Sequence, residues 1–413
     1  MTANENQTAW IIILLSSTIL MIGMGIRQTT GLFINPIIDA TGQSLISVSF
    51  ALAVGQLIWG LAQPFFGAVA DKKGSYIVLV IGTLLLSAGT ALTAYADTEF
   101  LLLLTLGILM PAGAGAGSFS LLIGATSRQI PANKRALAAG VINAGGSMGQ
   151  FVFAPLVQIG INAFGWIYTL FGLAAAALTA IPLSKFLCKN EDAPSARNEK
   201  GSANNSSSAE EQTSLSLQLK KAFFTPSYHF LCAGFFTCGF HVAFLTTHLP
   251  SEVALNGHAA IVSATSIGLI GFFNIGGSLA AGALGNYYRM KYILACMYGS
   301  RAIMILMFLA APKTTLTFYV FSASMGFTWL ATVPPTAGLI GKLFGLRYLA
   351  TLLGLAVFIH QVGAFLGAWF GGLVMAQSGN YQWMWYADTL LAAFAAFINL
   401  PIKEKRLSED TSI

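Results

Sequence analysis

Two arginines, Arg27 and Arg301, lie inside long apolar stretches of this 413-residue sequence. A charge in lipid costs at least about 2.5–3.5 kcal/mol, so a charged residue inside such a stretch is a candidate functional residue. The planar guanidinium group of arginine can bind a carboxylate through two parallel N–H groups. No Asp or Glu falls in the middle of an apolar stretch, and Asp388 is the deepest acid. The sequence therefore predicts a net positive interior, which favours an anionic ligand over a cationic one.

Each arginine has two interpretations. Arg27 lies about 25 Å along a helix from Trp10, so it either binds a carboxylate or extends its charged end to the outer membrane surface. Arg301 lies about 15 Å beyond Lys291, too deep to reach the surface easily. It either binds substrate or is structural, bonded to helix carbonyls or to polar side chains on neighbouring helices.

Two histidines, His241 and His360, also lie in the middle of apolar stretches. Histidine titrates near neutral pH, so either residue is a candidate proton carrier. The alternative for each is a buried, neutral histidine with an ordinary hydrogen bond. Nothing in the sequence decides between these roles.

Further polar residues are candidates to line a binding site. Gln56, Trp59 and Gln63 lie near one face of a predicted helix, at spacings of three and four residues. Each such residue is more often a packing residue than a ligand contact, although as a set they would shape a pocket. Besides Arg27 and Arg301, the predicted substrate-binding residues are Gln56, Trp59, Asn143, Asn274, Trp329 and Gln361.

Composition indicates an integral membrane protein. The chain is 55% hydrophobic and only 9% charged, with a mean hydropathy of +0.71, whereas soluble domains carry about 25% charged residues. A membrane helix needs about 20 apolar residues. Twelve such runs are present, at 10–33, 47–70, 76–95, 99–124, 136–161, 164–184, 228–250, 261–284, 291–311, 316–341, 349–375 and 382–400.

The basic residues predict the orientation. All 21 Lys and Arg except Arg27, Arg301 and Lys313 fall in alternate loops or at the C-terminal end. Cytoplasmic loops carry this excess, so we expect a multi-pass protein of the cytoplasmic membrane with both termini inside. The loops also account for the net charge of +6, so nucleic acid is not an expected partner.

The chain divides into two halves of six predicted helices. Residues 1–184 and 225–413 flank a Ser-, Asn- and Glu-rich stretch at 185–224, which is expected to be a flexible cytoplasmic linker. The halves repeat: GAVADKKG from Gly67 is echoed by GALGNYYR from Gly282, and Gly149 is matched by Gly363 at nearly the same offset. Repeats with a site between them near the membrane midplane are a known transporter architecture.

The segment GAVADKKG from Gly67 resembles the signature of the major facilitator superfamily, and the resemblance extends over essentially the whole chain. It implies two pseudo-symmetric bundles of six transmembrane helices. In that family the signature latches the cytoplasmic side while the transporter faces outward. The resemblance assigns this role to Asp71 with Lys72 and Lys73, and tight packing to Gly67. The second latch would be uncharged, because Asn286 replaces the acid.

Other stretches resemble bacterial relatives of the monocarboxylate transporters and oxalate–formate exchangers. They are Gly25-Ile-Arg27, CGFHVAFLTTHLP from Cys238, and HQVGAFLGAWFGG from His360. The resemblance implies a small organic anion, carried with a proton or by exchange. Animal members have an Asp and an Arg where this chain has Asn274 and Ser278, so their proton mechanism does not transfer directly.

The sequence therefore predicts a secondary transporter of a small organic anion that works by alternating access. It is expected to act as a monomer in the lipid bilayer, without enzymatic activity, cofactor or metal. An exporter of amphipathic drugs or metabolites is the alternative, but the absence of acids in the middle of the predicted spans argues against it.

Overall fold

The computed structural model describes residues 3–131, 134–189, 215–285, 287–345 and 349–404. These residues form helices and short connections, with no strand among them. Ten helical stretches in this part of the chain are long and apolar enough to cross a membrane. One of them, Leu137–Leu187, contains two predicted spans that meet at Gly165, whose φ of 81° interrupts the helix. The all-helical membrane fold predicted from the sequence is confirmed.

The elements of the N-terminal half lie close to the predicted spans. They are α1 (Ala3–Gln28), η1 (Thr30–Phe33), α2 (Ile34–Thr41), α3 (Leu45–Lys73), α4 (Ser75–Leu92), η2 (Thr93–Tyr95), α5 (Glu99–Leu102), the π-helix η3 (Leu103–Leu109), α6 (Met110–Ala116), α7 (Phe119–Ser127), α8 (Arg135–Leu178) and α9 (Ala180–Leu187).

The C-terminal half is described from the end of the predicted linker onward. Its elements are α11 (Leu215–Phe223), α12 (Pro226–Leu255), α13 (Ala260–Leu284), α14 (Met290–Ala310), α15 (Thr315–Thr328), α16 (Val333–Phe344), α17 (Leu349–Ser378) and α18 (Gln382–Asn399). Most of the predicted linker, residues 190–214, lies outside the described residues.

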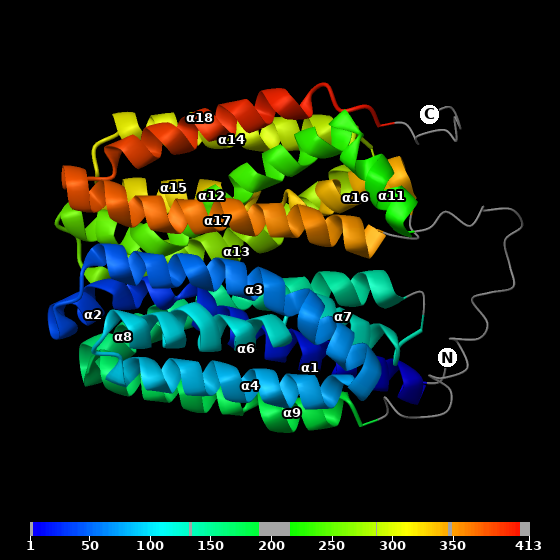
Figure 1. The fold of residues 1–413 in the computed structure, drawn as a ribbon, viewed down its shortest axis with the longest axis horizontal. Coiled ribbons are helices and arrows are strands. Elements are labelled where there is room, and N and C mark those ends of the chain that lie inside the picture. The colour runs from blue at the N-terminus through cyan, green and yellow to red at the C-terminus, as the bar shows by residue number, and fades with distance from the viewer. Residues whose placement is uncertain (1–2, 132–133, 190–214, 286, 346–348, 405–413) are drawn as a thin grey trace, which may run out of the picture.

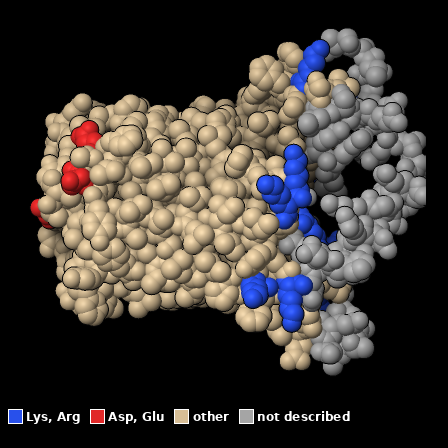
Figure 2. All heavy atoms as spheres, turned by 60° about the horizontal axis from the view of Figure 1, so that its bottom comes forward, with Lys and Arg blue, Asp and Glu red and all other residues tan. Residues whose placement is uncertain are grey.

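The two halves lie side by side with their long helices along one direction (Figure 1). Helix α1 begins and helix α18 ends at the same end of the bundle, on the right in Figure 1. The face drawn in Figure 2 has its blue Lys and Arg side chains at that end and its red Asp and Glu side chains at the other, with an uncharged belt between. This distribution fits helices that cross a bilayer. We call the end opposite the first turn of α1 the outer end, after the orientation that the sequence predicts.

The repeat between the halves is visible in the helix packing. Gly149 of α8 lies so close to α1 that an added Cβ would collide with the carbonyl oxygen of Met21. Gly363 of α17 lies in the same way against the carbonyl oxygen of Phe236 in α12. Small residues allow membrane helices to approach this closely. The glycine match seen in the sequence therefore marks equivalent helix contacts in the two halves.

One predicted span, 316–341, is broken in the middle. α15 ends at Thr328 and α16 begins at Val333, followed directly by Pro334 and Pro335. Proline has no backbone N–H and is accepted in the first turn of a helix but not in its interior. The break leaves carbonyl groups at the end of α15 without helical N–H partners, so other groups must bind them.

The halves contact each other through α3 with α17 and α8 with α13. At the outer end, Gly31 of η1 lies against the carbonyl oxygens of Thr246 and Thr247 in α12. Nearer the middle, a Cβ on Gly271 of α13 would lie 2.6 Å from the carbonyl oxygen of Ser147 in α8. Among the described residues, the contacts that we observe between the halves are hydrogen bonds, contacts between aromatic rings, and glycines packed closely against the other half. They lie in the middle of the helices or towards the outer end.

Candidate functional site

Arg27 lies in the last turn of α1, at the boundary with α3. Its Nη2 donates a hydrogen bond to Oε1 of Gln56, and its guanidinium carbon lies 4.1 Å from the centre of the Trp59 ring. Gln56 and Trp59 lie one turn apart on α3, so the face predicted from their spacing is the face that holds the arginine. A guanidinium over an indole ring is a favourable cation–π contact.

The arginine retains donors for a ligand. Its Nη2 is paired with Gln56, whereas Nε and Nη1 have no hydrogen bond to the residues that the structure describes. The Nε1–H of neighbouring Trp59 is buried and has no partner among the described residues. Gln56 is neutral, and neither ion pair given for the described residues involves Arg27. The site therefore combines an uncompensated positive charge with unused N–H groups.

The C-terminal half meets this site through α17. Gly60, next to Trp59, lies so close to Gln361 that an added Cβ would be 2.6 Å from Cγ of the glutamine. Nε2 of Gln361 and Nδ1 of His360 are 3.2 Å apart, whereas Oε1 of Gln361 and Nε2 of His360 are buried without partners in the described part of the chain. Unused polar atoms thus lie on both sides of the boundary between the halves.

Asn274 connects the halves by hydrogen bonds that use its whole amide group. Its Nδ2 donates to Oγ of Ser147 in α8 (2.8 Å), and its Oδ1 accepts from the backbone N–H of Leu330 (2.9 Å) and from Oγ of Ser278 (3.3 Å). Leu330 lies in the break between α15 and α16. The structure therefore places Asn274 as a structural bridge as well as a residue at the boundary.

Arg301 has a different environment from Arg27. It is completely buried in α14, and Nη2 donates to the carbonyl oxygens of Thr328 and of Trp329, the latter at 2.6 Å. Nε donates to Oγ1 of Thr328 (3.1 Å) and Nη1 to Sγ of Cys238 (3.5 Å). A cation at a helix C-terminus is stabilised by the helix dipole. Arg301 thus binds the free carbonyls that the break in the span exposes.

The remaining predicted residues are scattered. Among the described residues, Trp329 is buried within the break with its Nε1 unpartnered, and Asn143 is half-buried on α8 without a side-chain hydrogen bond. At the latch, Lys72 and Lys73 are exposed, and the side chain of Asp71 lies outside the described residues. Among the described residues, a Cβ on Gly67 would meet no atom within 4 Å, and the role of these latch residues stays a prediction.

Sequence reasoning missed one pair. His241 of α12 and Asp388 of α18 form an ion pair, Nδ1 against Oδ1, and both are 0% exposed. The sequence gave His241 as a candidate proton carrier and Asp388 as the deepest acid, but it gave no sign that the two helices bring them together. The adjacency of α12 and α18 in the fold is the missing information.

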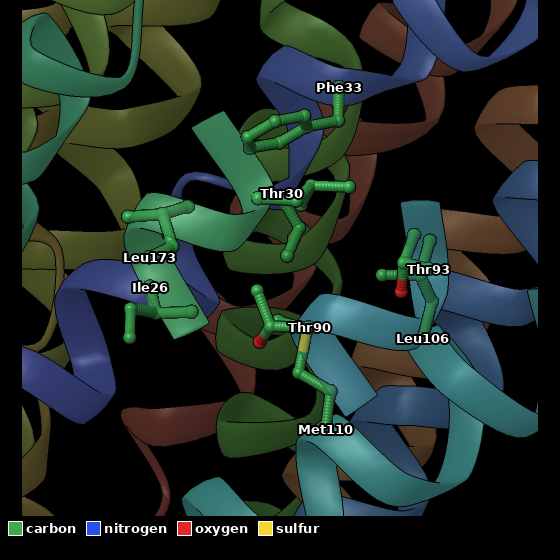
Figure 3. A pocket seen from close by; sticks show the side chains of 9 residues that line it. Ile26, Thr30, Phe33, Thr90, Thr93, Leu106, Met110 and Leu173 are labelled. Atoms are coloured by element: carbon green, nitrogen blue, oxygen red, sulfur yellow. The ribbon is translucent and has the colours of Figure 1, made fainter. Parts of the chain in front are cut away.

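A small cavity inside the N-terminal half is separate from these residues. Its volume is about 10 Å³, at the lower limit for one water molecule. Three threonines line it (Figure 3), but each hydroxyl donates to a backbone carbonyl three or four residues earlier in the chain. The remaining lining is apolar, so the cavity offers a ligand little to bind. The lining residues are Ile26, Thr30, Phe33, Thr90, Thr93, Leu106, Met110, Leu170 and Leu173.

Comparison with known proteins agrees with this architecture. Over 97% of both chains, the protein is 24% identical to an uncharacterized MFS-type transporter, YcxA, of Bacillus subtilis (strain 168). It is 25% identical to monocarboxylate transporter 13 of Rattus norvegicus, over 95% of this chain and 89% of that protein. It is also 25% identical to the oxalate:formate antiporter of Oxalobacter formigenes, over 94% and 90% of the two chains.

The fold is also that of a solved transporter. The crystal structure of a D-xylose-proton symporter superposes with a TM-score of 0.74 over 98% of this chain and 100% of that one, at 14% sequence identity. A family model described as the Major Facilitator Superfamily matches residues 12–368. That match covers most of both six-helix halves. The chain therefore belongs to the Major Facilitator Superfamily.

Proposed function

We propose that this protein is a secondary transporter that moves a small organic anion, a monocarboxylate, across the cytoplasmic membrane by alternating access. The observation that carries the proposal is Arg27: a guanidinium held by Gln56 and Trp59, with donors unused and no carboxylate partner in the described structure. Coupling to a proton or exchange for a second anion drives the transport.

The electrostatics of Arg27 explain why an anion is the expected ligand. An unpaired charge in a partly desolvated site costs free energy, and an anion that binds there recovers it. Arginine binds a carboxylate through two parallel N–H···O bonds, which fix both its position and its orientation. The indole N–H of Trp59 adds a further donor beside the arginine. A cation would meet repulsion at the same place.

The position of the site between the halves supports alternating access. The observed contacts between the halves lie in the middle and towards the outer end. This distribution is expected of a conformation that is closed on the outer side. Rocking of one half against the other around a fixed midplane site is a recognised transport mode. The basic end in Figure 2 is then the cytoplasmic end, with both termini inside.

The relatives support the substrate class. One is described as a monocarboxylate transporter and another as an oxalate:formate antiporter, so both names refer to small carboxylates. The sequence resemblance implies an Asp and an Arg in the animal members at the positions where this chain has Asn274 and Ser278. Arg27 is therefore the residue to which we assign the substrate carboxylate.

Uptake into liposomes tests the proposal directly. Purified protein is reconstituted, and uptake of labelled formate, acetate, lactate and oxalate is measured beside substrate-induced thermal shifts. We expect uptake of at least one acid and a loss of about 100-fold in affinity in Arg27→Ala, which corresponds to about 3 kcal/mol for bonds to a charged group.

A matched control separates binding from folding. Gln63→Ala removes another polar side chain of α3, near the face that holds Arg27 but without a bond to it, and should retain uptake. The proposal is wrong if the folded wild-type protein transports none of these acids, or if Arg27→Ala transports them as the wild type does.

A further inference from the structure

The ion pair between His241 and Asp388 lies in the interior of the C-terminal half. Both side chains are 0% exposed. On the outer side, Phe244 lies one turn after His241 in α12 and Trp385 one turn before Asp388 in α18, with ring centres 4.9 Å apart in an edge-on contact. Trp385 also packs against Phe308, again with ring centres 4.9 Å apart. An aromatic layer therefore covers the pair on its outer side.

On the inner side the neighbouring groups are polar. Cys238 lies one turn before His241, with its Sγ 3.3 Å from Oγ1 of Thr332. Nη1 of Arg301 donates to the same sulfur. The next residue, Gly239, packs on the backbone of His360, which belongs to the boundary between the halves. Polar groups thus connect the level of the pair with the substrate site, whereas rings separate it from the outer end.

Stability alone does not account for this pair. A buried ion pair is weak evidence for stability, because apolar residues of the same size are often at least as favourable. In addition, Nε2 of His241 and Oδ2 of Asp388 have no hydrogen-bond partner among the described residues. Each unsatisfied buried polar group costs about 1–3 kcal/mol. Such groups in a membrane interior indicate a functional role.

A third charge, that of Arg301, lies near the pair through its contact with Cys238. With one proton the imidazolium and the carboxylate cancel, and Arg301 is left without an acid partner. Without that proton, the carboxylate charge remains and Arg301 offsets it from the next turn through Cys238. The titratable or charged residues on α12, α14, α15, α17 and α18, and at Tyr381 just before α18, are, besides the pair, Tyr228, His229, Cys232, Cys238, His248, Glu252, Lys291, Tyr292, Cys296, Tyr298, Arg301, Tyr319, His360, Tyr381 and Tyr386.

We propose that His241 and Asp388 together bind the proton that this transporter moves with its substrate, an inference that rests on the proposed function. The proton is held between Nδ1 and Oδ1 and leaves to water by way of the polar inner side. The pair then consists of a neutral imidazole and a carboxylate. One proton bound here and one monocarboxylate at Arg27 give a cotransport without net charge.

Two transport assays distinguish this inference from the proposed function. Counterflow, the exchange of labelled for unlabelled acid, needs a substrate site but no net proton movement. Proton influx with net uptake is read from a pH-sensitive dye trapped in the liposomes. The variants are Asp388→Asn and His241→Gln. The matched control is His248→Gln, on the same helix and equally buried, whose ring nitrogens are already bonded to Ala368 O (2.7 Å) and Tyr381 Oη (3.2 Å).

We expect wild-type protein and His248→Gln to move protons with the acid. Asp388→Asn and His241→Gln should lose proton-driven uptake by about tenfold, within the usual range for coupling between two sites, while counterflow persists. If the single variants do not fold, the double variant His241→Gln with Asp388→Asn, which carries no charge in the pair, replaces them. This inference, but not the proposed function, is overturned if the variants move as many protons per substrate as the wild type. It is also overturned if the wild type shows counterflow but moves no proton. Absence of counterflow in the wild type overturns the proposed function, and this inference with it.

Discussion

The two membrane arginines have the same chemistry and opposite environments. Arg301 is completely buried, and its guanidinium group binds two carbonyl oxygens, a hydroxyl and a sulfur within its own half. Arg27 is half-buried, with one bond to a neutral amide and a ring beneath it. An arginine whose donors are used maintains structure, whereas one whose donors are free can bind a ligand. The depth of a charge in the membrane therefore does not identify the binding site.

The difference has a local cause in the sequence. Pro334 and Pro335 interrupt the helix that packs beside Arg301, and the interruption frees the carbonyls that the arginine binds. α1 has no proline within it, and the turn after Arg27 satisfies its own carbonyls through Thr29 and Thr30. The backbone carbonyls at this end of α1 therefore do not take up the N–H donors of Arg27.

The largest expected effect is on the stability of an Arg301→Ala variant. The change leaves the carbonyls of Thr328 and Trp329 unpaired and creates a cavity, so we expect a loss of about 3–5 kcal/mol in the free energy of unfolding. Thermal unfolding in detergent measures it. Arg27→Ala in the same assay should change stability by less than about 1 kcal/mol. A stable Arg301→Ala that has lost binding would reverse the roles of the two arginines.

A smaller effect on substrate affinity is expected when the charge of Arg27 is kept but its planar guanidinium group is lost. Arg27→Lys retains attraction to an anion but cannot form two parallel bonds, so affinity should fall about tenfold, or about 1.4 kcal/mol. Substrate-dependent thermal shifts measure the affinity. The same affinity in Arg27→Lys and wild type would show that the guanidinium geometry is not used.

The sequence predicted more of the fold than of the site. Apolar run length and loop charge located the helices, and the glycine repeat located the equivalent contacts of Gly149 and Gly363. The Gln56–Trp59 face was predicted because spacing along one helix is local information. The roles of Arg301 and of the His241–Asp388 pair depend on which helices are neighbours, and run length carries no such information. The Val-Pro-Pro run at 333–335 was the one signal for the helix break.

The ring beneath Arg27 should contribute less than its charge. Trp59→Leu keeps an apolar side chain but removes the cation–π contact and the indole N–H, so we expect affinity to weaken by about 1 kcal/mol. Trp59→Phe keeps a ring and should lose less. Isothermal titration with the transported acid separates the two variants. Equal losses would indicate that the indole N–H, rather than the ring face, supports the site.

Lys313 extends the comparison to a cation outside the membrane spans. Like Arg301 it binds carbonyl oxygens at a helix end, those of Leu309 (3.4 Å) and Ala311 (3.2 Å) among them, but it is only half-buried in the loop after α14. Screening by water weakens such contacts, so Lys313→Met should lose at most about 1 kcal/mol of stability and leave transport unchanged.

The pH dependence of this small effect has a definite sign. Burial lowers the pKa of the Lys313 ammonium from its ordinary value of 10.5, and Glu252 opposes the shift. The folded state therefore holds this proton less tightly than the unfolded state, so the wild type should gain stability relative to Lys313→Met as pH rises from the lowered pKa towards 10.5. Unfolding temperatures of the two proteins across the alkaline range measure the trend. The opposite trend would mean that Glu252 outweighs burial, and that a loop cation at a helix end is held as firmly as Arg301.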